Sequence, residues 1–176
     1  MDRFARGPFQ VTYEARVDVG ALRQKRVANA QRRREEAQLD ALLVWKDENV
    51  RYLTDLRPQL IAGKTTVLNG ALLIAGHQPI LFCSGGERDR ADRTMPWIAE
   101  IHTIPIMEER SLIEGFVRAI LSAVLQEHGL LRARIGMDEG STSLVQLIGK
   151  YLPEVRLEDG DTPMQQARKI KLSEEL

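Results

Sequence analysis

The chain has 176 residues, 43% hydrophobic and 28% charged, which suits a single soluble domain with a real core. Its 25 basic and 25 acidic residues cancel, which argues against a general nucleic-acid partner. The lone Cys83 excludes an internal disulfide and a cysteine-ligated zinc site, and no apolar run approaches the ~20 residues that cross a bilayer. The N-terminus carries no secretory h-region, so we expect a cytoplasmic protein with no membrane partner.

Residues 1–17 show no regular period and contain Gly7-Pro8, which predicts an N-terminal arm. A helix is then expected from Asp18, as its capping residue, to Leu39. A thin apolar stripe would face the core, made of Leu22, Val27, Ala30 and Ala37.

This helix is also rich in cations: Arg23, Lys25, Arg26, Arg32, Arg33 and Arg34. They indicate either a solvated face, on which Arg32 pairs with Glu36 four residues later, or an anion-binding or partner-facing surface.

The stretch 41–56 is the centre of the predicted fold. Five apolar residues, Ala41 to Trp45, predict a strand that is buried on both faces. A polar break follows, in which Asp47 or Asn49 could cap a short helix. Val50 and Leu53 lie three residues apart and would face inward from that helix.

Two apolar runs, 71–75 and 80–83, flank a Gly/Pro turn and predict a β-hairpin. A short surface helix is expected over 87–95, ended by Pro96, and a further strand over 101–104.

A strong amphipathic helix is expected from Ser111 to His128, with a Ser111–Glu114 capping box and Gly129 as its left-handed stop. Residues 134–137 read as a strand. Ser141 would cap another helix, whose inward residues are Leu144, Val145, Leu147, Ile148 and Tyr151. A last strand at 155–157 and a helix from Asp161 onward complete the pattern.

Helices alternate with strands except at the hairpin. This arrangement predicts an α/β fold, a three-layer sandwich in which helices cover both faces of a mixed sheet.

Residue chemistry alone reveals no active site. Ala62-Gly63-Lys64-Thr65 lacks the earlier glycine of a phosphate-binding loop, because that position is Pro58. His77, His102 and His128 show no ligand-like spacing, and each is expected to be structural. Cys83 ends an apolar strand and is expected to be a small buried hydrophobe.

The layout as a whole resembles the N-terminal domain of the creatinase, prolidase and aminopeptidase P family, the pita-bread metallopeptidases. The segments that carry the resemblance are 39–44, 49–54, 71–74, 80–82 with Glu87-Arg88, 135–138 and 167–175. The chain departs from the family at Asp55, where a glycine is usual, and in a long loop over 57–66.

The resemblance implies a ribonuclease H-like mixed sheet, with the family-type domain at 18–165 and the start of a helix at 166–176 that connects to a catalytic domain. It implies no catalytic residue, metal ligand or cofactor in this chain. A divalent metal pair would lie in the following catalytic domain, which is absent from the 176 residues.

The resemblance further implies a homodimer in which this domain borders the partner subunit's active site. Arg57, Gln59 and Lys64 are the loop residues expected to meet a peptide or small-molecule substrate. Three functions stay open: a domain of an Xaa-Pro dipeptidase or aminopeptidase, the same domain of a creatinase-like or dimethylsulfoniopropionate lyase-like enzyme, or a non-enzymatic protein-binding module.

Overall fold

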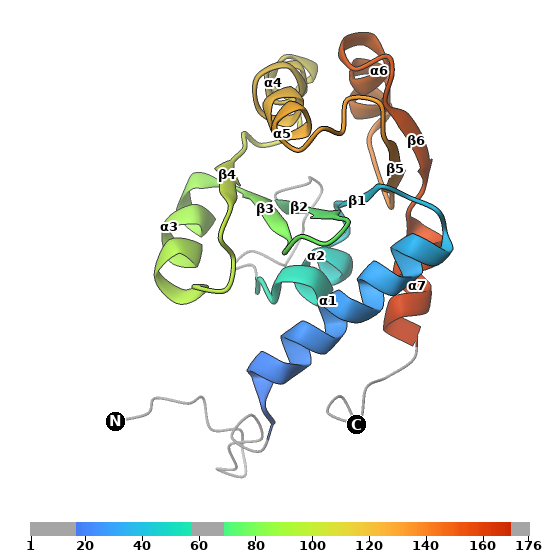
Figure 1. The fold of residues 1–176 in the computed structure, drawn as a ribbon. Helices are drawn as coiled ribbons and strands as arrows, with labels where there is room; N and C mark the ends of the chain where they lie inside the picture. The colour runs from blue at the N-terminus through green and yellow to red at the C-terminus, as the bar shows by residue number, and fades with distance from the viewer. Residues whose placement is uncertain (1–16, 58–68, 170–176) are drawn as a thin grey trace.

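A computed structural model describes residues 17–57 and 69–169 (Figure 1). A six-stranded mixed sheet in the order β4-β3-β2-β1-β5-β6 forms its centre. The hairpin strands β2 and β3 pair antiparallel, as do β1 and β2, while the remaining neighbours are parallel. The strands are β1 (Ala41–Val44), β2 (Asn69–Ile74), β3 (Ile80–Cys83), β4 (Ile101–Thr103), β5 (Arg134–Met137) and β6 (Arg156–Asp159).

Helices cover both faces of this sheet, which confirms the predicted three-layer α/β sandwich (Figure 1). The first face carries α4, α5 and α6, and the second carries α1, α2, α3 and α7. The helices are α1 (Val19–Glu36), α2 (Asp47–Thr54), α3 (Gly85–Thr94), α4 (Arg110–Gly115), α5 (Ser122–Glu127), α6 (Thr142–Tyr151) and α7 (Asp161–Lys169).

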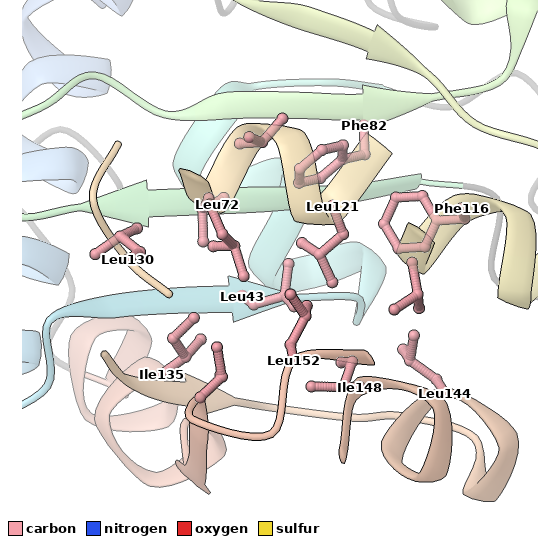
Figure 2. Close-up of a cluster of buried hydrophobic side chains, with 14 of the residues drawn as sticks. Leu43, Leu72, Phe82, Phe116, Leu121, Leu130, Ile135, Leu144, Ile148 and Leu152 are labelled. Carbon is pink, nitrogen blue, oxygen red and sulfur yellow. The ribbon is translucent and has the colours of Figure 1, made fainter. Parts of the chain in front are cut away.

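Strand β1 is buried on both faces, as predicted, because its side chains alternate between the two cores. Ala41 and Leu43 contribute to the core beneath α4, α5 and α6, and Leu42 and Val44 to the opposite core. Figure 2 shows Leu43 at the centre of this core, among the labelled side chains of the neighbouring strands and of the helices that cover them.

An aromatic cluster fills the first core next to β1. Trp45 stacks on Phe82 with ring centroids 6.2 Å apart and meets Phe116 edge-on at 5.6 Å. Gly70 lies directly against the indole, and a Cβ there would come within 2.4 Å of the ring. A large side chain at Trp45 therefore requires glycine on the neighbouring strand.

The predicted helix over 111–128 is present as a continuous helical stretch from Arg110 to Glu127, with a π-helical segment, Phe116–Leu121, in its middle. The predicted capping box is wrong, because Glu109 takes the N-cap position and Ser111 falls inside the first turn. Glu114 instead accepts from Lys150 and Tyr151 of α6. Gly129 adopts φ 69°, as expected of a helix stop.

Helix α1 begins as predicted, because the Asp18 side chain accepts the Ala21 N–H at 2.9 Å. The ion pair predicted for Arg32 is wrong: Glu36 pairs with Arg33 at 2.6 Å. Arg32 donates instead to the side chain of Asn29.

Helix α6 also begins as predicted, with Ser141 accepting the Leu144 N–H at 3.1 Å, but Val145 is exposed rather than inward. Helix α7 already begins at Asp161, so it includes residue 166, where the connecting helix is expected to start, and its last described residue is Lys169. No helix in the described ranges combines the length and apolar character needed to cross a membrane.

Candidate functional site

The candidate site is built around helix α2. The position of this helix is fixed by a carboxylate that directly follows a neighbouring strand of the sheet. Asp138 follows β5 and accepts the backbone N–H groups of Trp45 and Lys46 at 2.8 and 3.1 Å. It also accepts the side-chain amide of the fully buried Asn49 at 2.7 Å. The turn between β1 and α2 is therefore held by an acceptor from a distant part of the chain.

This arrangement corrects the predicted cap. Lys46, not Asp47 or Asn49, occupies the N-cap position of α2, and no side chain caps the helix in the usual way. Burial raises the pKa of Asp138, and the hydrogen bonds from Asn49 and from the Trp45 and Lys46 amides oppose that rise. Val50 and Leu53 face inward as predicted.

Helix α2 ends at Asp55, the residue where the chain departs from the family pattern. Asp55 has φ 61° and ψ 16°, the left-handed conformation in which glycine is favoured and aspartate is tolerated. Its backbone N–H donates to the Arg51 carbonyl at 2.8 Å. Its carboxylate pairs with Arg23 of α1 at 3.0 Å, so this departure has a structural explanation.

A cavity of about 570 Å³ opens beside this helix end. The Trp97 indole N–H donates to the Thr54 carbonyl at 2.9 Å, and the Arg23 guanidinium lies 3.4 Å from the Trp97 ring centroid. The cavity is thus fixed on one side by α1 and α2 and on the other by the segment that follows α3. Its lining residues include Asp18, Arg23, Asp55, Arg57, Arg90 and Trp97.

Arg57 is exposed and lines this cavity. The Arg90 guanidinium holds its carbonyl oxygen at 2.9 Å, and Arg90 is in turn bound by Glu87 of the same helix. The backbone at Arg57 is therefore fixed to α3. The other two predicted site residues, Gln59 and Lys64, lie outside the described residues.

The three histidines, which show no common spacing in the sequence, lie together in the fold. Glu100 contacts His102 Nε2 at 2.7 Å and His128 Nε2 at 3.2 Å. His77, in the hairpin turn, meets the His128 ring edge-on with centroids 5.4 Å apart. The sequence gives no signal for this cluster, because its members come from a turn, a strand and a helix end.

The described residues offer neither a metal-binding cluster nor an accessible thiol. Across residues 17–57 and 69–169, no three His, Cys, Asp or Glu side chains are placed to hold a metal ion. Cys83 is fully buried, as predicted, and burial raises the pKa of its thiol to about 11.

Several solved structures with this fold are described as peptidases or peptidase domains. An XXA-pro aminopeptidase from Streptococcus pyogenes matches with a TM-score of 0.61 and 19% identity, covering 85% of this chain and 99% of that one. The N-terminal domain of cytoplasmic peptidase PepQ from Mycobacterium tuberculosis matches with a TM-score of 0.59 and 18% identity, covering 81% and 98%. The Xaa-Pro dipeptidase from Bacillus anthracis matches with a TM-score of 0.60 and 14% identity, covering 86% of this chain but only 37% of that one.

At these identities the structures establish the fold alone, and no curated protein matches significantly. The family is established by sequence. The model of the Creatinase/Prolidase N-terminal domain matches residues 26–170, which is most of the chain. The chain therefore belongs to the Creatinase/Prolidase N-terminal domain family.

Proposed function

We propose that this chain is the non-catalytic N-terminal domain of a metal-dependent Xaa-Pro dipeptidase- or aminopeptidase-like hydrolase. The family match and the peptidase neighbours support this role. The Bacillus anthracis dipeptidase extends well beyond the region that this chain covers, which is consistent with a second, catalytic domain. The protein would be cytoplasmic, as PepQ is described to be.

We further propose that the domain supports a homodimer and borders the partner subunit's active site through the loop that starts at Arg57. The observation that carries this proposal is the anchoring of Arg57. Its carbonyl is held by Arg90 at 2.9 Å, directly after a helix whose end is tied to α1 by Asp55. An exposed arginine that lines a cavity and whose backbone is anchored suits a substrate carboxylate, which a guanidinium binds through two parallel hydrogen bonds.

The metal pair that the resemblance implies does not fit the described part of this chain, where no three ligand-type side chains converge. We assign it to the following catalytic domain. The role of this domain is to shape the site and orient the substrate.

The alternatives are the same domain in a creatinase-like or dimethylsulfoniopropionate lyase-like enzyme, and a non-enzymatic protein-binding module. The unusual residue Asp55 gives no separate reason to prefer other chemistry, because it fills a helix-ending position and binds Arg23. The second departure from the family pattern, the long segment 57–66, is then the remaining sequence feature that could favour one of these alternatives.

The test is an assay of the full-length protein with Xaa-Pro dipeptides and Mn²⁺. We expect hydrolysis, and Arg57→Ala should raise KM by about 10- to 100-fold, because one charge-assisted contact is worth roughly 1.5–3 kcal/mol. Arg93→Ala is the matched control, since Arg93 is an exposed residue at the end of α3 that does not line the cavity. Failure to hydrolyse any Xaa-Pro dipeptide would exclude the peptidase assignment.

A further inference from the structure

A second cavity, of about 520 Å³, lies among α1, α2 and α7 and shares no lining residue with the cavity at Arg57. Its charge is unusual for a chain whose net charge is zero. Four lining side chains are cationic and one is acidic. The lining residues are Arg26, Glu48, Arg51, Tyr52, Gln165, Arg168 and Lys169.

Two of these cations have no internal role within the described part of the chain. Arg51 and Lys169 are exposed, and neither side chain forms a hydrogen bond or ion pair with any residue in 17–57 or 69–169. Elsewhere on α1 the basic side chains are used locally, as in the pairs Arg23–Asp55 and Arg33–Glu36. The cavity therefore contains positive charge from Arg51 and Lys169 that no described residue pairs with.

A third cation, Arg168, is only loosely paired. Its guanidinium lies 3.9 Å from Glu48, whose side chain is 55% exposed, and a pair at this distance and exposure is weak. Its Nε is buried without a hydrogen-bond partner. Arg168 can therefore exchange Glu48 for a ligand oxygen at little cost.

The walls that present these cations are tied together. The Tyr52 hydroxyl donates to the Ala167 carbonyl at 3.0 Å and accepts from the Asn29 amide at 3.1 Å. Asn29 also donates to that carbonyl, at 2.8 Å. One largely buried hydrogen-bond network, in which only Asn29 is partly exposed, thus joins α1, α2 and α7 next to the cavity, which limits the reorganisation that ligand binding would require.

The preference of helix C-termini for cations explains why some of these residues are basic, but not why they gather around one cavity. Arg51 lies in the last turn of α2, and Arg168 and Lys169 in the last turn of α7, where cations are favoured by the helix dipole. That effect accounts for each residue singly. It does not account for Arg26, which lies within α1 and faces the same cavity, nor for the excess of positive charge.

We propose that this cavity binds a compact polyvalent oxyanion, of the phosphate or polycarboxylate class, through Arg51, Arg168 and Lys169. Guanidinium groups match the planar, bidentate geometry of such oxygens, and the ammonium adds a point charge. The site is distinct from the Arg57 cavity, so it can exist whether or not the proposed peptidase role is correct.

The test titrates the 176-residue chain with pyrophosphate and, separately, with citrate, at ionic strength held constant with NaCl. Calorimetry should detect saturable binding at one site for at least one of the two anions. Binding of pyrophosphate alone assigns the phosphate class, binding of citrate alone assigns the polycarboxylate class, and binding of both assigns a general oxyanion site. No saturable binding of either overturns the proposal.

Variants connect the binding to the cavity. Arg51→Gln and Lys169→Gln should each weaken the affinity about tenfold, as expected for one charge-assisted contact. Arg93→Gln is the control, because it removes the same charge from an exposed residue in the last turn of another helix. Equal affinities in all three variants would show binding elsewhere and overturn the proposal. Matching thermal unfolding curves would confirm that the variants keep the fold.

Discussion

Asp138 offers the sharpest test of how the site is positioned. Replacing it with alanine removes the acceptor of three donors at once: the Trp45 and Lys46 amides and the Asn49 side chain. A buried donor left without its acceptor costs about 1–3 kcal/mol. The total cost for the three donors is smaller than three such losses for two reasons. The amide of the half-buried Lys46 can bind a water molecule instead, and the free energy spent on burying the carboxylate is recovered when the carboxylate is removed. We therefore expect Asp138→Ala to lower the free energy of unfolding by about 2–4 kcal/mol.

Urea denaturation measures this loss as a lower midpoint at an unchanged slope. Glu139→Ala is the control, because the exposed neighbouring acid should change stability by less than about 0.5 kcal/mol. The loss of unfolding free energy in Asp138→Asn should lie between those of Asp138→Ala and Glu139→Ala. The asparagine amide keeps one acceptor oxygen but places N–H groups against the remaining donors. If Asp138→Ala were as mild as Glu139→Ala, the carboxylate would not be what holds α2 in place.

The raised pKa of Asp138 adds a pH dependence. The folded protein keeps this proton to a higher pH than the unfolded chain, whose ordinary value is 3.8. Between those two pKa values the folded state binds more protons, so the stability contributed by Asp138 falls as the pH rises through that window. The difference in unfolding free energy between the wild type and Asp138→Asn should therefore shrink from acidic to neutral pH. A difference that grows would mean that the hydrogen bonds outweigh burial.

Three further predictions test the core and the end of α2. Cys83 is fully buried and burial raises the pKa of its thiol to about 11, so a thiol reagent at pH 8 should label it only as fast as the protein unfolds; labelling as rapid as in urea would contradict that placement. Gly70→Ala should lower the free energy of unfolding by about 1–3 kcal/mol, because its methyl group would press on Trp45, whereas Gly115→Ala on α4 should raise it by about 0.5–1 kcal/mol. Urea curves of the two variants should shift in opposite directions, and a shift in the same direction would refute the packing argument. Asp55→Gly and Asp55→Ala both remove the pair with Arg23, but glycine accepts φ 61° freely, so Asp55→Gly should stay within about 0.5 kcal/mol of the wild type and Asp55→Ala should cost about 1 kcal/mol. In thermal unfolding, an alanine variant as stable as the glycine variant would refute the backbone argument, and a glycine variant that loses as much as the alanine variant would show that the ion pair outweighs the backbone.

Local patterns in the sequence were enough to predict most of the fold. The double-sided burial of β1, the hairpin of β2 and β3, and the Ser141 cap all depend on residues a few positions apart. Their physical causes, hydrophobic alternation and side-chain capping, are therefore visible in a short window of sequence.

Features that depend on distant residues could not be predicted in this way. Asp138 takes the place of the expected cap of α2 because the sheet brings β5 beside β1. Glu114, predicted to form a capping box, instead accepts a hydrogen bond from Tyr151 of α6. The cluster of Glu100 with the histidines and the cationic cavity at Arg51 arise in the same manner, from elements that meet only in the folded chain.

The most direct test of the central claim, that this domain completes the partner subunit's active site through Arg57, is a subunit-mixing experiment in the full-length protein. One variant carries Arg57→Ala, and the other carries a metal-ligand substitution in the catalytic domain. Each alone should hydrolyse an Xaa-Pro dipeptide poorly. After co-refolding, mixed dimers should regain activity, because one of their two sites would pair an intact catalytic domain with an intact Arg57 from its partner. Activity no higher than the sum of the separate variants would contradict the claim.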